Sequence, residues 1–406
     1  MLRFSFSPNH DMNIGNLRVA ILNYIVSKQR SEDLIVRIED RDKERNIEGK
    51  DQEIVGILEL FGIEYSHIVH QSQNFRFHAA MALQLLLEKR AFNCFCSHEW
   101  LEKKRKEAKN NNEPYRYDDA CASLPDELVI DNENPFTVRI KKSQEPNAES
   151  FIIMTEDKRP TYSFACGIDD MLGDISLVIR DEEHIDDAAK EDWIRTSLGY
   201  EKKIEYVHLP AMQDGTSSVK WLLEEGFLPS AIANYLISTA IKPPKEIFTM
   251  QEAIEWFSLE NISKSPARFD IDVLKQINRE HLMMLDAKEL SRYVGFADEE
   301  IGKLAKVYLE EASTTKELRS KVGAIFAPKE IPEELKESVG MIASIIKKAP
   351  YFDRYEEFEN HIMKESGIKG ENFLKFLRLL LTGSEHTPDI AAVYKCIKNY
   401  IGEIVK

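Results

Sequence analysis

Residues 2–18 read Leu2-Arg-Phe-Ser-Phe-Ser-Pro-Asn-His-Asp-Met-Asn-Ile-Gly-Asn-Leu-Arg18, and the residue pattern changes twice within this segment. Residues 2–6 alternate as in a short strand, and residues 8–11 break the alternation. An amphipathic helix follows, and its apolar face is formed by Leu17, Ile21, Tyr24 and Ile25. A strand, a loop and a helix in this order predict one unit of an α/β fold.

Alternation of strands and helices continues along the chain. Residues 34–38 have the pattern of a second buried strand, and residues 44–61 have helical spacing. Further strand patterns occur at 135–140, 151–154 and 175–179, and the last two end beside polar clusters, where an α/β sheet usually has its site. Beyond about residue 215 the apolar spacing is helical throughout. The sequence therefore predicts a parallel sheet followed by an all-helical part.

Composition limits the class of protein. The chain has 406 residues, of which 43% are hydrophobic and 31% charged, which is typical of two or three globular domains. A net charge of −16 means that a nucleic-acid partner would need a local basic surface, so the charge neither proposes nor excludes RNA. Five cysteines suit a reducing compartment. No apolar run reaches the roughly 18 residues of a membrane span, and the start lacks the apolar core of a signal peptide, so we expect no membrane partner and a cytoplasmic protein.

Two segments carry groups with possible chemical roles. Gly15 at the start of the first helix lets a strand-to-helix turn present backbone N–H groups to phosphate, although an ordinary turn has the same appearance. Glu39, Asp40 and Asp42 follow the second strand directly. Acidic groups at the carboxyl end of a parallel strand can receive an ammonium group or a ribose hydroxyl.

Together these segments resemble class I glutamyl-tRNA synthetases, whose signatures run Arg-Phe-Ala-Pro-Ser-Pro-Thr-Gly, His-Ile-Gly-Gly/Asn/His and Arg-Ile-Glu-Asp-Thr-Asp. The resemblance continues to the far end of the chain, through residues 159–165, 178–184, 208–210, 226–229, 233–236 and 379–383. It implies a Rossmann-type class I catalytic domain with an inserted acceptor-binding subdomain, followed by all-α C-terminal domains. The expected boundaries are 1–76 with 150–210 for the catalytic domain, 77–149 for the insertion, 211–310 for a stem-contact domain and 311–406 for an anticodon-binding-like domain.

The resemblance also implies substrates and site residues. The family attaches glutamate to tRNA by way of glutamyl-adenylate, using ATP with Mg²⁺, and its members suggest a monomer. Arg3 falls where the family holds the side-chain carboxylate of glutamate, Arg180 where it holds the α-carboxylate, and Glu39 where it receives the α-ammonium. Ser7 and Tyr162 supply hydroxyls around the same amino acid. Each of the five alone has a plain alternative, a surface ion pair or a capped turn. The positions that would face ATP are His10, Glu183, His208 and Leu209.

The ATP motifs depart from the family. The first motif reads Asn13-Ile-Gly-Asn16, so a neutral amide replaces the leading histidine, while Gly15 and Asn16 stay within the pattern. His10 stands where the family has glycine and is a candidate replacement for the lost imidazole. The second motif, Lys-Met/Leu-Ser-Lys-Arg/Ser, is missing: residues 211–217 contain no lysine. Loss of one preorganised cation or donor of that kind costs about 10²–10³ in rate.

Two further departures concern the same site. Asp181-Glu-Glu-His184 replaces the usual Gly-Glu-Asp-His, which adds carboxylates beside a triphosphate, and the connection 141–150 is short. Two hypotheses therefore stand. The chain is either a glutamate–tRNA ligase with impaired adenylate formation, or a non-catalytic paralogue that binds glutamate and tRNA.

The predicted insertion has features of its own. Cys94, Cys96, Tyr117 and Cys121 have the spacing C-x-C…Y-x₃-C that some synthetases of this group use for zinc. The alternative is a set of small buried cysteines, as we expect for Cys166 and Cys396. The basic run at 103–109 is either a solvated helix face or a contact for the acceptor end of tRNA.

Overall fold

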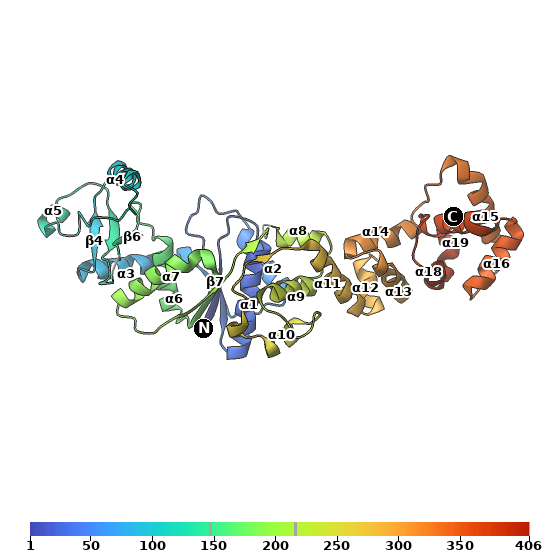
Figure 1. The fold of residues 1–406 in the computed structure, drawn as a ribbon, viewed down its shortest axis with the longest axis horizontal. Coiled ribbons are helices and arrows are strands. Elements are labelled where there is room, and N and C mark those ends of the chain that lie inside the picture. The colour runs from blue at the N-terminus through green and yellow to red at the C-terminus, as the bar shows by residue number, and fades with distance from the viewer. Residues whose placement is uncertain (146–147, 215–216, 406) are drawn as a thin grey trace. The chain divides into compact units, whose positions relative to one another are not determined.

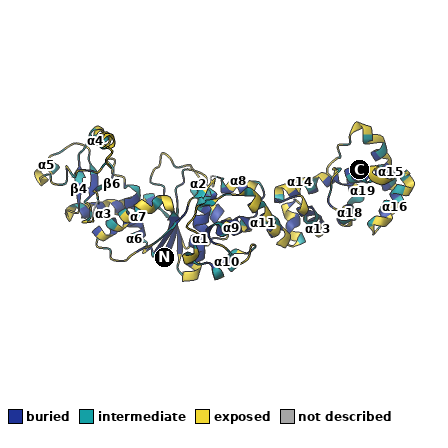
Figure 2. Cartoon of the chain, in the orientation of Figure 1, coloured by how far each residue is buried: buried dark blue, intermediate teal, exposed yellow. Residues whose placement is uncertain are grey.

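The computed structural model describes residues 1–145, 148–214 and 217–405. Its contacts divide the chain into two compact units, residues 1–216 with 251–268 and residues 217–250 with 269–406 (Figure 1). Buried side chains concentrate on the strands and on the first helix of the first unit, whereas helix α4 is exposed along most of its length (Figure 2). Within the described ranges, none of the helices is long and apolar enough to span a bilayer.

A five-stranded parallel sheet organises the first unit. Its strand order is β3-β2-β1-β7-β8, with bounds Ile68–His70, Leu34–Ile38, Leu2–Phe6, Leu177–Asp181 and Glu205–Leu209. Helix α1 (Ile14–Arg30) packs against β1 and β7. The chain leaves β1 to one side for β2 and returns on the other side as β7, so the order reverses at β1. Ligands of such sheets bind at the carboxyl ends of the strands beside this reversal. The α/β class with a parallel sheet is confirmed.

Helix α2 begins later than the sequence pattern indicates. It spans Lys50–Leu60, whereas helical spacing begins at residue 44. Gly49 has φ +75°, a left-handed conformation that interrupts a helix, and the N–H of Ile47 donates to Pro8 O at 2.8 Å. The segment before α2 is therefore attached to the loop after β1 and helps to shape the edge of the sheet.

A second, antiparallel sheet has the order β4-β5-β6, with bounds Ala91–Cys94, Thr137–Ile140 and Phe151–Met154. We expected residues 151–154 to end at the site edge of the parallel sheet, and this was wrong, because β6 pairs with β5 instead. Antiparallel neighbours can be joined by a short connection, whereas a parallel crossover needs about a dozen residues or more. The other elements of this region are η1 (Gln71–Asn74), α3 (Phe75–Leu87), α4 (His98–Asn110), α5 (Asp126–Ile130), α6 (Tyr162–Leu172), η2 (Glu182–His184) and α7 (Ile185–Ser197).

Short elements complete the first unit. Strand β9 (Met212–Gln213) pairs in parallel with β10 (Ala267–Arg268), and helix α10 spans Met250–Trp256. Gln29 of α1 donates to the carbonyl oxygens of Ile254 and Phe257, at 2.8 and 2.7 Å. These bonds explain why residues 251–268 belong with the sheet although they lie within the helical part of the sequence.

The second unit is helical, as predicted. Its α-helices are α8 (Val219–Glu224), α9 (Pro229–Ala240), α11 (Ile271–Met284), α12 (Ala287–Tyr293), α13 (Glu299–Val307), α14 (Thr315–Phe326), α15 (Lys336–Lys348), α16 (Tyr355–Ser366), α17 (Gly370–Thr382), α18 (Ile390–Ile397) and α19 (Ile401–Ile404). One cluster of buried side chains extends from Leu228 to Val405, on both sides of the expected boundary at residue 310. A Cβ atom at Gly302 would lie 1.6 Å from Ala287 O, so glycine permits the close approach of α13 to the start of α12.

Candidate active site

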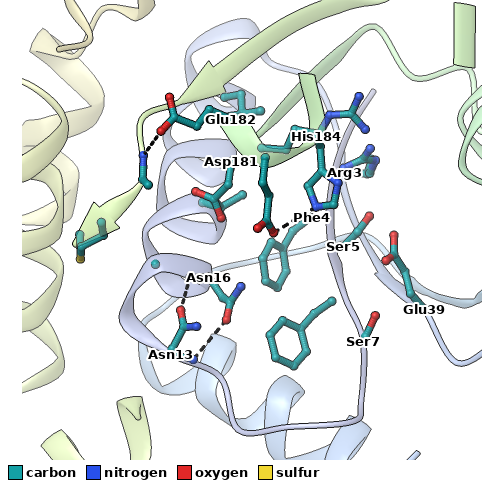
Figure 3. Close-up of a pocket in the computed structure, with 18 of the residues that line it drawn as sticks. Arg3, Phe4, Ser5, Ser7, Asn13, Asn16, Glu39, Asp181, Glu182 and His184 are labelled. Carbon is teal, nitrogen blue, oxygen red and sulfur yellow. Dashed lines mark hydrogen bonds and ion pairs between the residues drawn. The ribbon is translucent and has the colours of Figure 1, made fainter. Parts of the chain in front are cut away.

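A cavity of about 560 Å³ lies at the carboxyl ends of β1, β2 and β7 (Figure 3). It brings together most of the residues that the sequence singles out: Arg3, Ser7, His10, Asn13, Gly15, Asn16, Glu39, Tyr162, Arg180 and Glu183. Two of the four residues expected to face ATP do not line it. His208 lies on β8 opposite Arg180, with its ring stacked on Tyr206 at 6.0 Å, and Leu209 is a core residue, 1% exposed.

Arg3 is held by a carboxylate that the sequence analysis did not single out. Asp170 of α6 is fully buried and accepts hydrogen bonds from Arg3 Nε at 3.1 Å and Arg3 NH2 at 3.3 Å. The same carboxylate also accepts from Arg37 NH1. Burial alone would raise the pKa of Asp170, but the two guanidinium groups outweigh it and lower the pKa to about 2. Asp170 is therefore a permanent anion that fixes Arg3 at the cavity wall.

Arg180 has unused hydrogen-bonding capacity. It is 4% exposed, and its NH1 donates to Glu191 Oε1 at 2.8 Å. Its Nε and NH2 groups are buried and have no hydrogen-bond partner among the described residues. A buried N–H group without a partner is costly unless a ligand completes its bonding. Because Arg180 lines the cavity, a ligand carboxylate is the group that would pair with it most strongly.

The cavity wall around Glu39 mixes hydroxyls with one carboxylate. Glu39 is 9% exposed and accepts from Arg37 NH2 at 3.2 Å. Burial raises the pKa of Tyr162 well above its ordinary value, so its hydroxyl stays protonated. Ser5 lies between Arg3 and Ser7 on β1 and also lines the cavity, and its hydroxyl has no partner among the described residues. Sequence reasoning did not include Ser5.

The first turn of α1 is capped by its own side chains. Asn13 Oδ1 accepts from the backbone N–H of Asn16 at 2.9 Å, and Asn16 Oδ1 accepts from the backbone N–H of Asn13 at 3.2 Å (Figure 3). This capping box already uses two backbone donors at a helix start that would otherwise be available to an anion. His10 is exposed, bonds to the side chain of Asn9, and lies 4.9 Å from the ring of Phe6.

Carboxylates surround the opposite side of the cavity. Asp181, Glu182 and Glu183 all line it, and among the described lining residues there is no lysine. Asp181 Oδ1 lies 3.6 Å from Arg18 NH2, and burial raises the pKa of Asp181 despite that neighbour. Arg18 NH2 also donates to Pro210 O, at 2.5 Å.

The loop that follows β8 is fixed where it begins. Glu182 Oε1 accepts from the backbone N–H of Ala211 at 2.9 Å, and Met212 belongs to β9. Asp214 pairs with Arg268 at 3.0 Å. Residues 215–216 of this loop lie outside the described residues, as do residues 146–147 of the short connection at 141–150.

Helix α6 also connects the cavity to the start of α3. Asp169, next to Asp170, accepts hydrogen bonds from Gln71 Nε2, Asn74 Nδ2 and His78 Nε2, each at 2.8 Å. Adjacent carboxylates in an otherwise apolar helix are a signal that sequence reasoning can use, because buried acids need partners. The identity of those partners depends on the packing of α6 and α3.

Three thiols and a phenol meet on the antiparallel sheet. The Sγ atoms of Cys94, Cys96 and Cys121 lie within 4.8 Å of one another. Tyr117 Oη lies 3.3 Å from Cys94 Sγ and 3.4 Å from Cys96 Sγ. Three sulfur ligands and one oxygen fit the four-coordinate preference of Zn²⁺, so these residues are suited to hold zinc.

Comparison with known proteins agrees with this fold. Residues 1–276 match the family model for the catalytic domain of class I tRNA synthetases (E and Q), and residues 280–398 match that for an anticodon binding domain. A solved glutamate tRNA ligase from Elizabethkingia meningosepticum, in complex with its amino acid, superposes with a TM-score of 0.81 at 23% identity, covering 100% of this chain and 98% of that one. A second solved structure, from Elizabethkingia anophelis, has a TM-score of 0.78 at 24% identity, with the same coverage. Sheet, cavity and matches together define a class I tRNA synthetase.

Curated relatives narrow the class. The chain is 67% identical to glutamate–tRNA ligase 2 of Sulfurimonas denitrificans and 50% identical to glutamate–tRNA ligase 1 of Nitratiruptor sp., with 100% of each chain covered. The chain belongs to the glutamate–tRNA ligase family. Both alignments extend over 432 positions, whereas this chain has 406 residues, so they contain positions that this chain lacks.

Proposed function

We propose that this chain binds glutamate and tRNA, and that its ATP-dependent attachment of glutamate to tRNA through glutamyl-adenylate is severely impaired. One observation carries the proposal: Arg3 and Arg180 line the cavity together with three carboxylates, and its described lining residues include no lysine. The carboxylates are Asp181, Glu182 and Glu183. The cavity thus suits an amino acid with two carboxylates better than it suits a triphosphate.

The amino-acid side supports glutamate as the ligand. Two nitrogens of Arg180, Nε and NH2, have no hydrogen-bond partner among the described residues, and Arg3 is fixed by Asp170 at a second point of the wall. A carboxylate at each guanidinium and an ammonium at Glu39 would match the three charges of glutamate. Burial makes such charge-assisted contacts stronger than they would be in water.

The ATP side supports impairment. In the family reaction, glutamate and ATP give glutamyl-adenylate and pyrophosphate, and the glutamyl group then passes to the terminal ribose of tRNA. A departing pyrophosphate needs donors and cations, yet Asn13 uses its side-chain oxygen to cap α1, and residues 211–217 contain no lysine. Mg²⁺, which accompanies ATP in this class, would offset only part of the missing charge.

The tRNA partner is supported by two regions. Residues 280–398 match the anticodon binding domain, and α4 carries an exposed basic run at 103–109 on the inserted region. A local basic helix is what an acidic chain needs in order to contact phosphates. We further propose a monomer that works in the cytoplasm and holds zinc through Cys94, Cys96, Cys121 and Tyr117, called here the thiol–phenol set.

Pyrophosphate exchange tests the main proposal. The full chain is incubated with glutamate, ATP, Mg²⁺ and labelled pyrophosphate, with and without purified tRNA, beside a family member that has both complete ATP motifs. We expect exchange at least 100-fold slower than in that reference, on the scale of one lost transition-state donor. An exchange rate within tenfold of the reference refutes the impairment. Asn13→His combined with a restored Lys-Met-Ser-Lys-Arg loop should recover exchange.

A non-catalytic binding protein is the second candidate, favoured by the same acidic side of the cavity. It predicts glutamate and tRNA binding with no exchange at any ATP concentration and no recovery on restoring the motifs. Gel retardation with tRNA at rising salt checks the partner that both candidates share. Absence of retardation even at low salt would remove tRNA from both.

A further inference from the structure

Arg139 lies against the thiol–phenol set, which is Cys94, Cys96, Cys121 and Tyr117, and is not one of its candidate ligands. It belongs to β5 and is 6% exposed. Its Nε donates to Cys94 Sγ at 3.3 Å. The guanidinium carbon lies 3.9 Å from the centroid of the Tyr117 ring. A buried cation therefore contacts two of the four candidate ligands directly.

The backbone explains why Arg139 is held there. Arg139 pairs across the antiparallel ladder with Phe92 of β4, so the two side chains lie on one face of the sheet. The Phe92 ring stacks on Tyr117 at 6.3 Å with an interplanar angle of 15°. Arg139 NH1 donates to Ser150 O at 3.2 Å, which fixes the other end of the guanidinium group. Two strands and the segment before β6 thus orient Arg139 toward the ligands.

The positive charge of Arg139 would balance the negative charge of a metal-bound ligand set. Three thiolates around Zn²⁺ carry a net charge of −1 with a neutral phenol and −2 with a phenolate. Cys94, Tyr117 and Cys121 are buried, and excess charge is costly in a medium of low dielectric constant. A guanidinium group in contact with the thiolate offsets that excess and donates a hydrogen bond to sulfur. Groups in this position orient metal ligands and tune their affinity for the metal.

We propose that Arg139 is a positioning residue for zinc: its Nε orients Cys94, its face orients the Tyr117 ring, and its charge offsets the excess negative charge of the metal-bound set. The inference rests on the proposed zinc site. It is specific to Arg139, because Arg105, which lines the same small cavity of about 260 Å³, stacks on Tyr115 instead and has a half-exposed side chain.

Zinc affinity of the full-length chain tests the proposal without using its activity. Zinc content is measured by mass spectrometry, and the dissociation constant by competition with a chromogenic chelator, for the wild type, Arg139→Gln, Arg139→Lys and the control Arg105→Gln. We expect Arg139→Gln to weaken zinc binding about 10- to 100-fold. Arg139→Lys should fall between, because it keeps the charge and loses the planar fork. Arg105→Gln should stay within about twofold of the wild type.

Cobalt substitution provides the second measurement, because sulfur-to-cobalt charge-transfer bands report how the thiolates are arranged. A shifted band in Arg139→Lys supports the positioning role even if Arg139→Gln fails to fold. Wild-type zinc affinity and an unshifted cobalt spectrum in both Arg139 variants overturn the role of Arg139 while leaving the zinc site in place. A wild type that binds no more zinc than Cys121→Ser overturns the zinc site itself, and the proposal with it.

Discussion

Asp170 is the residue whose removal should affect the first unit most clearly. It is 0% exposed and bonds to Arg3 and Arg37 at once. Asp170→Asn therefore leaves the Arg3 guanidinium without a carboxylate partner among the described residues, and leaves Arg37 with Glu39 alone. A pKa of about 2, against an ordinary 3.8, corresponds to about 2–3 kcal/mol at roughly 1.4 kcal/mol per pKa unit. Breaking a buried ion pair costs about 3–5 kcal/mol. We therefore expect the variant to lose about 3 kcal/mol of unfolding free energy.

Urea denaturation at several pH values measures this loss. The folded pKa of Asp170 lies below its unfolded value, so its contribution is complete above about pH 4 and disappears as the pH falls toward 2. The difference between the wild type and Asp170→Asn should therefore shrink over that interval. Asp174→Asn is the matched control, because Asp174 is an exposed carboxylate paired with Lys202 and its removal should leave the unfolding free energy close to the wild-type value. Equal stability of Asp170→Asn and the wild type at pH 7 would refute the reasoning.

Three other predictions concern the cavity and the helical unit. Asp181→Gly should tighten binding of ATP by about 1–2 kcal/mol, or five- to thirtyfold, because it removes a carboxylate from the phosphate side, while Asp186→Asn, outside the cavity, should not. Calorimetry with a non-hydrolysable ATP analogue checks this. Equal affinity of the wild type and Asp181→Gly for the analogue would show that this carboxylate does not weaken ATP binding. Arg180→Gln should weaken glutamate binding about 10- to 100-fold, because hydrogen bonds to charged groups contribute about 1.5–3 kcal/mol. Equilibrium dialysis measures the binding. The control Arg45→Gln, at an exposed arginine, should have no effect. An unchanged dissociation constant would exclude Arg180 from the binding site. Gly302→Ala should destabilise the second unit by at least about 1–3 kcal/mol, because the new Cβ atom would collide with Ala287 O. The control is Gly340→Ala in α15, where no described atom beyond the helix's own backbone lies within 4 Å of the new Cβ atom, and it should be neutral or slightly stabilising. Thermal unfolding measures both. Similar melting temperatures for the two glycine variants would contradict the close approach of α12 and α13.

Local patterns predicted the elements that meet at the cavity. Residues 2–6 and 34–38 are short apolar strands followed by polar loops, and this pattern depends only on neighbours in the sequence. The strand at 151–154 was placed in the wrong sheet, because its apolar pattern does not specify a pairing partner. The start of α2 was missed because Gly49 adopts a left-handed conformation that helical spacing does not reveal.

Some site residues could be predicted from the sequence, and others became apparent only in the fold. Arg3 and Arg180 were singled out by the resemblance to the family, and Glu39 both by the resemblance and by its place directly after a strand. Asp170 and Glu191, which hold two of these groups, belong to α6 and α7, and their roles depend on how those helices pack against the sheet. Sequence spacing indicates that a buried acid exists, and only the assembled fold shows which cation it faces.

The self-capped first turn of α1 has a consequence for phosphate binding at the start of this helix. Asn13 is tethered beside the amide that it occupies, so its local concentration far exceeds that of a freely diffusing nucleotide, and an incoming phosphate has to displace it. A cap of this kind contributes about 1 kcal/mol to the stability of the helix start, so a phosphate that displaces it should bind several-fold more weakly. Asn13→His would remove that intramolecular competition and would also supply a proton donor, so one substitution would have two effects.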